Sequence, residues 1–214
     1  METLAEDAPR DWLARPAPRE SAAPAPASAP VEALPDTLEA FVAWRLGDAA
    51  PEAGWLTPRI GPSGPADAEL MILTDMPEAE DGATLLEGAP GRLLDAMLAA
   101  IGESRESAYV ASLAVARPLT GQIPADDEPR LAALARHHVA LVAPQRLLLL
   151  GQAANRVYPT TSGSAQGNTG CDINHSVRNM EAVAIDHPRF LLRRPAGKAE
   201  VWKQLLRLRR GTSE

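Results

Sequence analysis

From residue 69 onward, short apolar runs alternate with longer amphipathic segments, and this alternation restricts the fold more than any other feature of the sequence. The apolar runs have the length of strands, whereas the longer segments repeat their apolar residues at helical spacing. Strands that alternate with helices indicate a parallel sheet covered by helices on both faces. We therefore predict an α/β fold with three layers (α/β/α), built on a central four-stranded parallel sheet.

The predicted elements are placed by apolar spacing and by the residues that begin and end helices. Strands are expected at Glu69–Thr74, Ala108–Leu113, Arg146–Leu150 and Glu181–Asp186. Helices are expected at Pro90–Ile101, Glu128–Val142, Gly151–Tyr158 and Ala196–Leu208. A further helix opens at Asp36, the predicted N-cap, which forms a capping box with Glu39 and is followed by helix up to Gly47.

The carboxyl ends of the predicted strands locate a candidate site. In parallel sheets covered by helices, ligands bind outside these ends. The segments that reach this edge are Thr74-Asp75-Met76, Ser112, Gly151-Gln152 and Asp186-His187. We therefore expect a carboxylate and an imidazole, which are far apart in the chain, to meet at one edge of the sheet.

The first 35 residues differ in composition from the rest of the chain. They hold seven of its twenty prolines and few large apolar residues, which is typical of an extended, disordered segment. We predict a Pro/Ala-rich N-terminal arm at 1–35 and a folded domain at 36–210. Trp12 and Leu13 are the exception in the arm; they are either an isolated apolar pair or a short peptide that binds a protein partner.

Cysteine, charge and hydropathy exclude several classes of protein. Cys171 is the only cysteine, so we expect a free thiol and exclude an internal disulfide, a cysteine-rich zinc site and a four-cysteine cluster. We expect no metal and no cofactor. The net charge of −7 argues against a protein that coats nucleic acid indiscriminately, although a local basic face remains compatible with it. No apolar run approaches the roughly 20 residues that span a bilayer, and the N-terminus lacks a secretory pattern. We expect a cytoplasmic protein without membrane partners.

A succession of motifs between about residues 69 and 208 resembles one known family. Residues 187–202 read HPRFLLRRPAGKAEVW, similar to the HPxxLLRxPxxKxxxW signature of the uracil-DNA glycosylases that carry an iron–sulfur cluster. Residues 88–98 (GAPGRLLDAML) resemble their GxAGxLLDxML helix, and residues 135–151 resemble their next helix and third strand. Arg117-Pro118, with Pro124 and Glu128 at family spacing, resembles their RPPGNRxPxxxE loop. The chain thus resembles a divergent member of the uracil-DNA glycosylase superfamily that lacks the cluster cysteines.

The resemblance implies a chemistry and two catalytic residues. Such enzymes extrude uracil from DNA into a pocket and hydrolyse its N-glycosidic bond. A carboxylate stabilises the cationic sugar and orients water, while a histidine stabilises the departing uracil anion. The resemblance places Asp75 at the carboxylate, where the family has GEAPG and this chain has TDMPE, and His187 at the histidine. The alternative for Asp75 is a helix cap at the end of a strand.

The positions that would bind the base depart from the family pattern. Leu85 or Leu86 replaces the stacking Phe of GxPFVG, and Ser112 replaces the base-reading Asn. A serine hydroxyl cannot reproduce the paired hydrogen bonds of an amide, and leucine lacks an aromatic face. With Met76, these residues form the expected base-binding set; the alternative for both leucines is the hydrophobic core.

The C-terminal segment from His187 is basic, with eight Lys or Arg and two acidic residues. Its first cations, Arg189, Arg193, Arg194 and Lys198, are expected to contact DNA phosphates; a solubilising basic tail is the alternative. We therefore expect a protein that hydrolyses the N-glycosidic bond of uracil in single-stranded or uracil-containing DNA, in base-excision repair, with reduced activity. The alternative is a catalytically silent DNA-binding or protein-interaction module derived from the same fold.

Overall fold

The computed structural model describes residues 34–151, 157–158, 171–175 and 178–210. The N-terminal arm, Gln152 and most of the helix expected at 151–158 lie outside these residues. Within them, a helix that is long and apolar enough to cross a membrane is not found.

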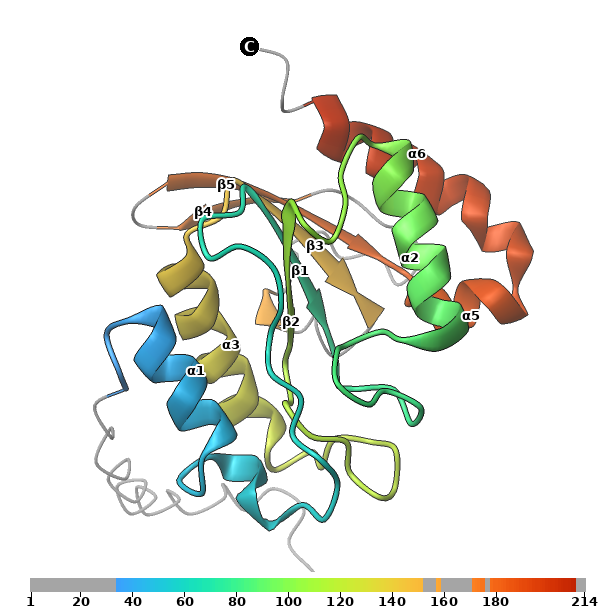
Figure 1. The fold of residues 1–214 in the computed structure, drawn as a ribbon. Coiled ribbons are helices and arrows are strands. Elements are labelled where there is room, and N and C mark those ends of the chain that lie inside the picture. The colour runs from blue at the N-terminus through green and yellow to red at the C-terminus, as the bar shows by residue number, and fades with distance from the viewer. Residues whose placement is uncertain (1–33, 152–156, 159–170, 176–177, 211–214) are drawn as a thin grey trace, which may run out of the picture. The chain divides into compact units, whose positions relative to one another are not determined.

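Five strands form one sheet in the order β2-β1-β3-β5-β4 (Figure 1). Four of them are parallel, as predicted: β1 (Leu70–Thr74), β2 (Ala108–Ser112), β3 (Arg146–Leu150) and β5 (Arg178–Ile185). All residues of β1, β2 and β3 are buried, because helices cover both faces of a parallel sheet and leave no solvent side. This burial explains why these strands are continuous apolar runs in the sequence.

The fifth strand, β4 (Cys171–His175), was not predicted. It pairs antiparallel with β5 at the edge of the sheet, from Cys171 beside Ala182 to His175 beside Arg178. Its residues, CDINH, carry no apolar alternation, so only the partner strand defines it. The same pairing explains why β5 begins at Arg178 instead of the expected Glu181.

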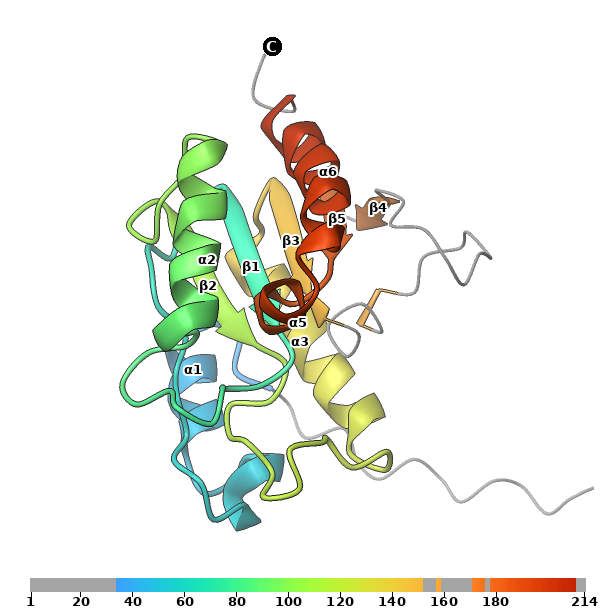
Figure 2. The same ribbon diagram turned by 90° about the vertical axis from the view of Figure 1, so that its right-hand side faces the viewer.

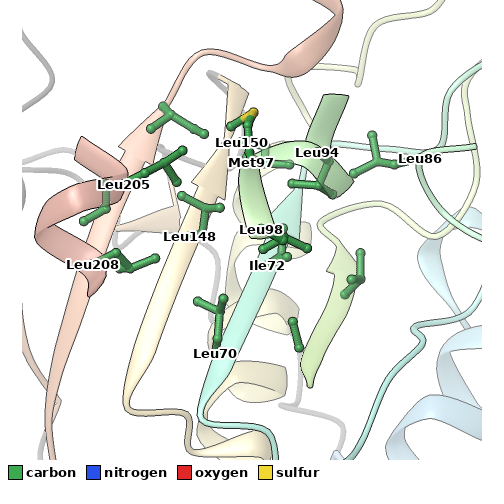
Figure 3. Packing of buried hydrophobic residues seen from close by; sticks show 14 of the residues in the cluster. Leu70, Ile72, Leu86, Leu94, Met97, Leu98, Leu148, Leu150, Leu205 and Leu208 are labelled. Atoms are coloured by element: carbon green, nitrogen blue, oxygen red, sulfur yellow. The ribbon is translucent and has the colours of Figure 1, made fainter. Parts of the chain in front are cut away.

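One face of the sheet is covered by α2 (Gly88–Ala100) and α6 (Lys198–Arg210) (Figures 1 and 2). Leucines of these helices pack on alternate residues of the strands, as Figure 3 shows for Leu94 and Leu98 of α2 and Leu205 and Leu208 of α6. Their partners on this face include Leu70, Ile72, Leu148 and Leu150.

The other face is covered by α3 (Glu128–Val142), and α1 (Leu38–Leu46) packs on α3 (Figure 1). The remaining alternate strand residues, such as Met71, Leu73 and Leu149, meet Leu131 and Val139 of α3 there. The three-layer α/β/α arrangement with four parallel strands is therefore confirmed.

A buried ion pair ties the N-terminal elements to the loop after β2. Arg45 of α1 lies 2.7 Å from Glu52 of the short 3-10 helix η1 (Pro51–Gly54) and donates to the Leu113 carbonyl at 2.8 Å. Glu52 in turn accepts a hydrogen bond from the Val115 amide. Because both charged groups are buried and paired, this loop is held firmly where it leaves the sheet.

Several helix boundaries differ from the predicted ones; α2, for example, runs over Gly88–Ala100 where Pro90–Ile101 was expected. The N-cap of α1 is Thr37, whose hydroxyl accepts from the Ala40 amide, so the predicted cap at Asp36 was one residue early. The closing helix is preceded by α5 (Pro188–Arg193) and the 3-10 turn η2 (Pro195–Gly197). Pro195 lacks an amide hydrogen and disfavours helical backbone at Arg194, which ends α5 before α6 begins at Lys198.

Candidate active site

The carboxyl ends of β1, β3 and β5 bring three segments together. Asp75 directly follows β1, Gly151 follows β3, and His187 lies two residues after β5. The Asp75 Oδ1 and His187 Nε2 atoms are 3.9 Å apart. The predicted meeting of the carboxylate and the imidazole at one edge is therefore present in the structure.

Gly151 lies beside both groups at the end of β3. Its φ angle is +81°, a left-handed conformation that residues with a Cβ adopt rarely. A Cβ at this position would lie 3.6 Å from both Asp75 Oδ2 and the Cβ of His187. The backbone of Gly151 thus forms the floor between the two functional groups.

The hydrogen bonds of His187 select one tautomer. The Arg189 amide donates to Nδ1 at 3.2 Å, so Nδ1 carries no proton. Nε2 lies 3.1 Å from Thr74 Oγ1, whose hydroxyl donates to Asp75 Oδ1 at 3.3 Å. Thr74 therefore accepts from an Nε2–H group. Burial lowers the pKa of His187 to about 4, so the ring is a neutral hydrogen-bond donor at neutral pH.

Asp75 is held by three donors and is 5% exposed. Its Oδ1 accepts from Thr74 and from the Met76 amide at 3.1 Å, and its Oδ2 accepts from Arg189 Nη2 at 2.8 Å. The helix-cap alternative is wrong, because a loop follows β1 and α2 begins only at Gly88, after Glu87 as N-cap.

Arg189 points into the site, and its predicted contact with DNA phosphates stays a prediction. Its guanidinium bridges two carboxylates, Asp75 at 2.8 Å and Glu78 at 3.0 Å. The buried Asp75 and the partly buried Glu78 both offer the cation charge-assisted hydrogen bonds at the end of β1. Arg193, Arg194 and Lys198, in contrast, are exposed, as a phosphate-binding role requires.

Glu78 is a site residue that the sequence analysis did not assign. Its Oε1 lies 3.3 Å from His187 Nε2 as well as in contact with Arg189. Burial raises the pKa of Glu78, although the nearby guanidinium groups of Arg189 and Arg117 oppose the shift. The only signal in the sequence was the replacement of the last glycine of GEAPG by an acidic residue.

A cleft of about 750 Å³ opens above these groups. It is lined by both signs of charge and by the predicted base-binding residue Met76: Asp75, Glu78, Glu128, Arg117, Arg189 and Arg193 are the charged members. His187 itself is fully buried, whereas Glu78, whose Oε1 lies 3.3 Å from His187 Nε2, lines the cleft together with Arg189.

The other predicted base-binding residues do not line this cleft. Leu85 and Leu86 are buried in the core that α2 covers, where Figure 3 shows Leu86 beside Leu94. Their prediction as a stacking surface is wrong and the core alternative is right, since the loop turns both side chains under α2. Ser112 is 6% exposed beside Thr74 in the sheet, and its hydroxyl has no hydrogen-bond partner among the residues described.

Asp81 organises the loop between β1 and α2. Its carboxylate accepts from three backbone amides, those of Glu78 at 2.7 Å, Leu86 at 2.9 Å and Glu87 at 2.7 Å. The loop therefore holds Glu78 over the site and directs Leu86 into the core. Asp81 was not identified from the sequence, because carboxylates that bind loop amides leave no periodic pattern.

Within the described part of the chain, His, Cys, Asp and Glu side chains do not gather in a group of three that could hold a metal ion. The fold and site thus define an α/β protein with a carboxylate and a neutral imidazole at the carboxyl edge of a parallel sheet. The sequence matches the uracil DNA glycosylase superfamily over residues 62–206, well over half of the chain, and the protein belongs to that superfamily.

Proposed function

We propose that this protein is a uracil-DNA glycosylase that hydrolyses the N-glycosidic bond of uracil in DNA during base-excision repair. The observation that carries the proposal is the approach of the His187 Nε2 atom to within 3.9 Å of the Asp75 carboxylate, at the carboxyl edge of the parallel sheet. These are the two groups that the reaction requires, and segments far apart in the chain supply them.

Each group has a distinct part in the proposed reaction. When the C1′–N1 bond breaks, its electron pair leaves with uracil and positive charge grows on the sugar. The Asp75 carboxylate stabilises that charge and orients the water whose oxygen bonds to C1′, with release of a proton. The Nε2–H of His187 donates to the uracil oxygen on which negative charge grows, the same principle as an oxyanion hole.

Two features of the site favour a low rate. The leucines that replace the stacking aromatic are buried in the core, and Ser112 offers one hydroxyl in place of an amide. Arg193, Arg194 and Lys198 are exposed, and we propose that they contact the DNA phosphates, with Arg193 at the wall of the cleft.

A second candidate is a catalytically silent DNA-binding module. The observation that favours it is the ion pair between Asp75 and Arg189 at 2.8 Å, because a carboxylate engaged by a guanidinium is less able to stabilise a sugar cation.

A cleavage assay separates the two candidates. The full chain is incubated with single- and double-stranded oligonucleotides that carry one uracil, and alkali-labile breaks are measured. An enzyme produces breaks that are lost in His187→Ala and Asp75→Asn but retained in Glu80→Gln, a matched change at an exposed carboxylate. DNA binding that weakens with salt, without any breaks, would instead identify the module.

A further inference from the structure

The position on His187 that a base would use is already occupied. Thr74 Oγ1 accepts from the Nε2–H group at 3.1 Å, and Glu78 Oε1 occupies the space beside the same nitrogen, 3.3 Å from it. A base carbonyl that approaches Nε2 must therefore take the place of one of these two oxygens. Thr74 is fully buried in β1 and cannot withdraw, whereas Glu78 lies on the loop and lines the cleft.

Arg189 holds Glu78 in this place. Its guanidinium donates to Glu78 through Nη1 and to Asp75 through Nη2. The side chains of Glu78 and Asp75 are 11% and 8% exposed, respectively, so solvent screens these ion pairs less than pairs on the open surface. The same cation therefore blocks two groups, since it fixes Glu78 against His187 and neutralises Asp75.

We propose that Glu78 and Arg189 form a gate: the Glu78 carboxylate takes the place of the uracil carbonyl on His187, and Arg189 keeps it there until DNA binds. This gate deepens the proposed function and rests on it. Glu78 stands at the end of β1, where the chain departs from the family pattern. Arg189 directly follows the His187-Pro188 pair.

DNA can open the gate because a phosphate offers Arg189 an alternative anion. Guanidinium groups form paired hydrogen bonds with phosphates as readily as with carboxylates. Arg189 is 23% exposed, and the exposed Arg193 lines the same cleft, so a phosphate bound at this wall would draw Arg189 outward. Free uracil carries no phosphate and must displace Glu78 unaided.

The gate is tested by binding of free uracil to the full chain, followed through the Nε2–H signal of His187 in histidine-labelled protein. We expect Glu78→Ala to bind uracil about tenfold more tightly than the wild type, a factor that corresponds to about 1.4 kcal/mol. Glu78→Gln keeps an acceptor but loses the ion pair with Arg189, so its affinity for uracil should lie between those of the wild type and Glu78→Ala. Glu80→Ala, which removes the same charge from an exposed neighbour, should bind as the wild type does.

A comparison with DNA tests the opening step. For a single-stranded oligonucleotide with one uracil, the gain in affinity from Glu78→Ala should be several-fold smaller than for free uracil, because phosphates already draw Arg189 away. Equal gains for both ligands would overturn opening by DNA. Glu78→Gln with wild-type affinity beside a tighter Glu78→Ala would overturn the role of Arg189.

The whole gate is overturned if folded Glu78→Ala binds uracil no more tightly than the wild type or does not bind it. Strand cleavage decides the proposed function separately. Tighter uracil binding by Glu78→Ala without cleavage by any variant would retain the gate and reject the glycosylase.

Discussion

At the scale of single residues, a backbone amide and a hydroxyl select the tautomer of His187. The Arg189 amide occupies Nδ1, and Thr74 connects Nε2 to Asp75. A neutral imidazole that is already oriented needs no rearrangement when negative charge develops on the base, which is the condition under which such donors are most effective.

Gly151→Ala tests the floor of the site. The left-handed φ of +81° makes a Cβ unfavourable at this position, so we expect a loss of about 1–2 kcal/mol in the free energy of unfolding. The added methyl group would fit in ordinary van der Waals contact beside Asp75 and His187, so we expect activity to fall only through the change that the strained backbone imposes on these two groups. Denaturant unfolding and uracil excision are the measurements.

Gly54→Ala is the matched control for this change, because a Cβ at Gly54 meets no atom within 4 Å and its φ angle is not positive. Equal unfolding free energies for the two variants would contradict the conformational role of Gly151.

At the scale of elements, the loop between β1 and α2 decides what the cleft contains. Asp81 binds the amides of Glu78 near its start and of Leu86 and Glu87 at its end. One carboxylate therefore sets both the position of the gate and the burial of the leucines.

Asp81→Ala should destabilise the protein by about 2 kcal/mol, because hydrogen bonds to charged groups contribute more than neutral ones and three partly buried donors would lose their acceptor. Amide hydrogen exchange at Leu86 and Glu87 should accelerate, while that of the strands should change only as far as global stability does. Asp81→Asn keeps one acceptor oxygen, so its stability and its exchange rates should lie between those of the wild type and Asp81→Ala. Unchanged exchange at both amides would show that the loop holds its shape without Asp81.

At the scale of the whole molecule, two buried histidines connect stability to pH. Burial lowers the pKa of His187 and of His138 to about 4 each; for His138 the positive charge of Arg45 and the neighbouring His137 act in the same direction. His138 is 6% exposed and lies 2.9 Å from the Tyr109 hydroxyl. Between about pH 6.5 and 4, the unfolded chain binds more protons than the folded one.

The stability due to these histidines is therefore complete above about pH 6.5 and is lost as the pH falls toward 4. The raised pKa of Glu78 acts in the opposite direction. The side-chain amide of Gln in a His138→Gln variant reaches the place of Nε2. We expect this variant to lose about 2 kcal/mol less of its free energy of unfolding between pH 7 and 4.5 than the wild type does. Urea unfolding of both proteins at the two pH values measures this loss. An equal loss in His138→Gln and the wild type would contradict the titration of His138.

The sequence by itself determined the parallel sheet and the edge at which the site lies. Strands covered on both faces must be apolar throughout, so β1, β2 and β3 are visible as local runs. The residues that follow β1 and β5, Asp75 and His187, inherit their positions from that pattern. The edge strand β4 has no such run, because pairing with β5 alone defines it.

Only the tertiary structure decided which groups face one another at that edge. Arg189 reads as part of a basic segment, yet it turns inward because two carboxylates from a distant loop converge beside it. Leu85 and Leu86 lie under α2, and Glu78 lies against His187. The spacing of apolar residues along the sequence indicates which elements are buried. The partner of a charged side chain depends instead on distant segments that only folding brings within a few ångströms.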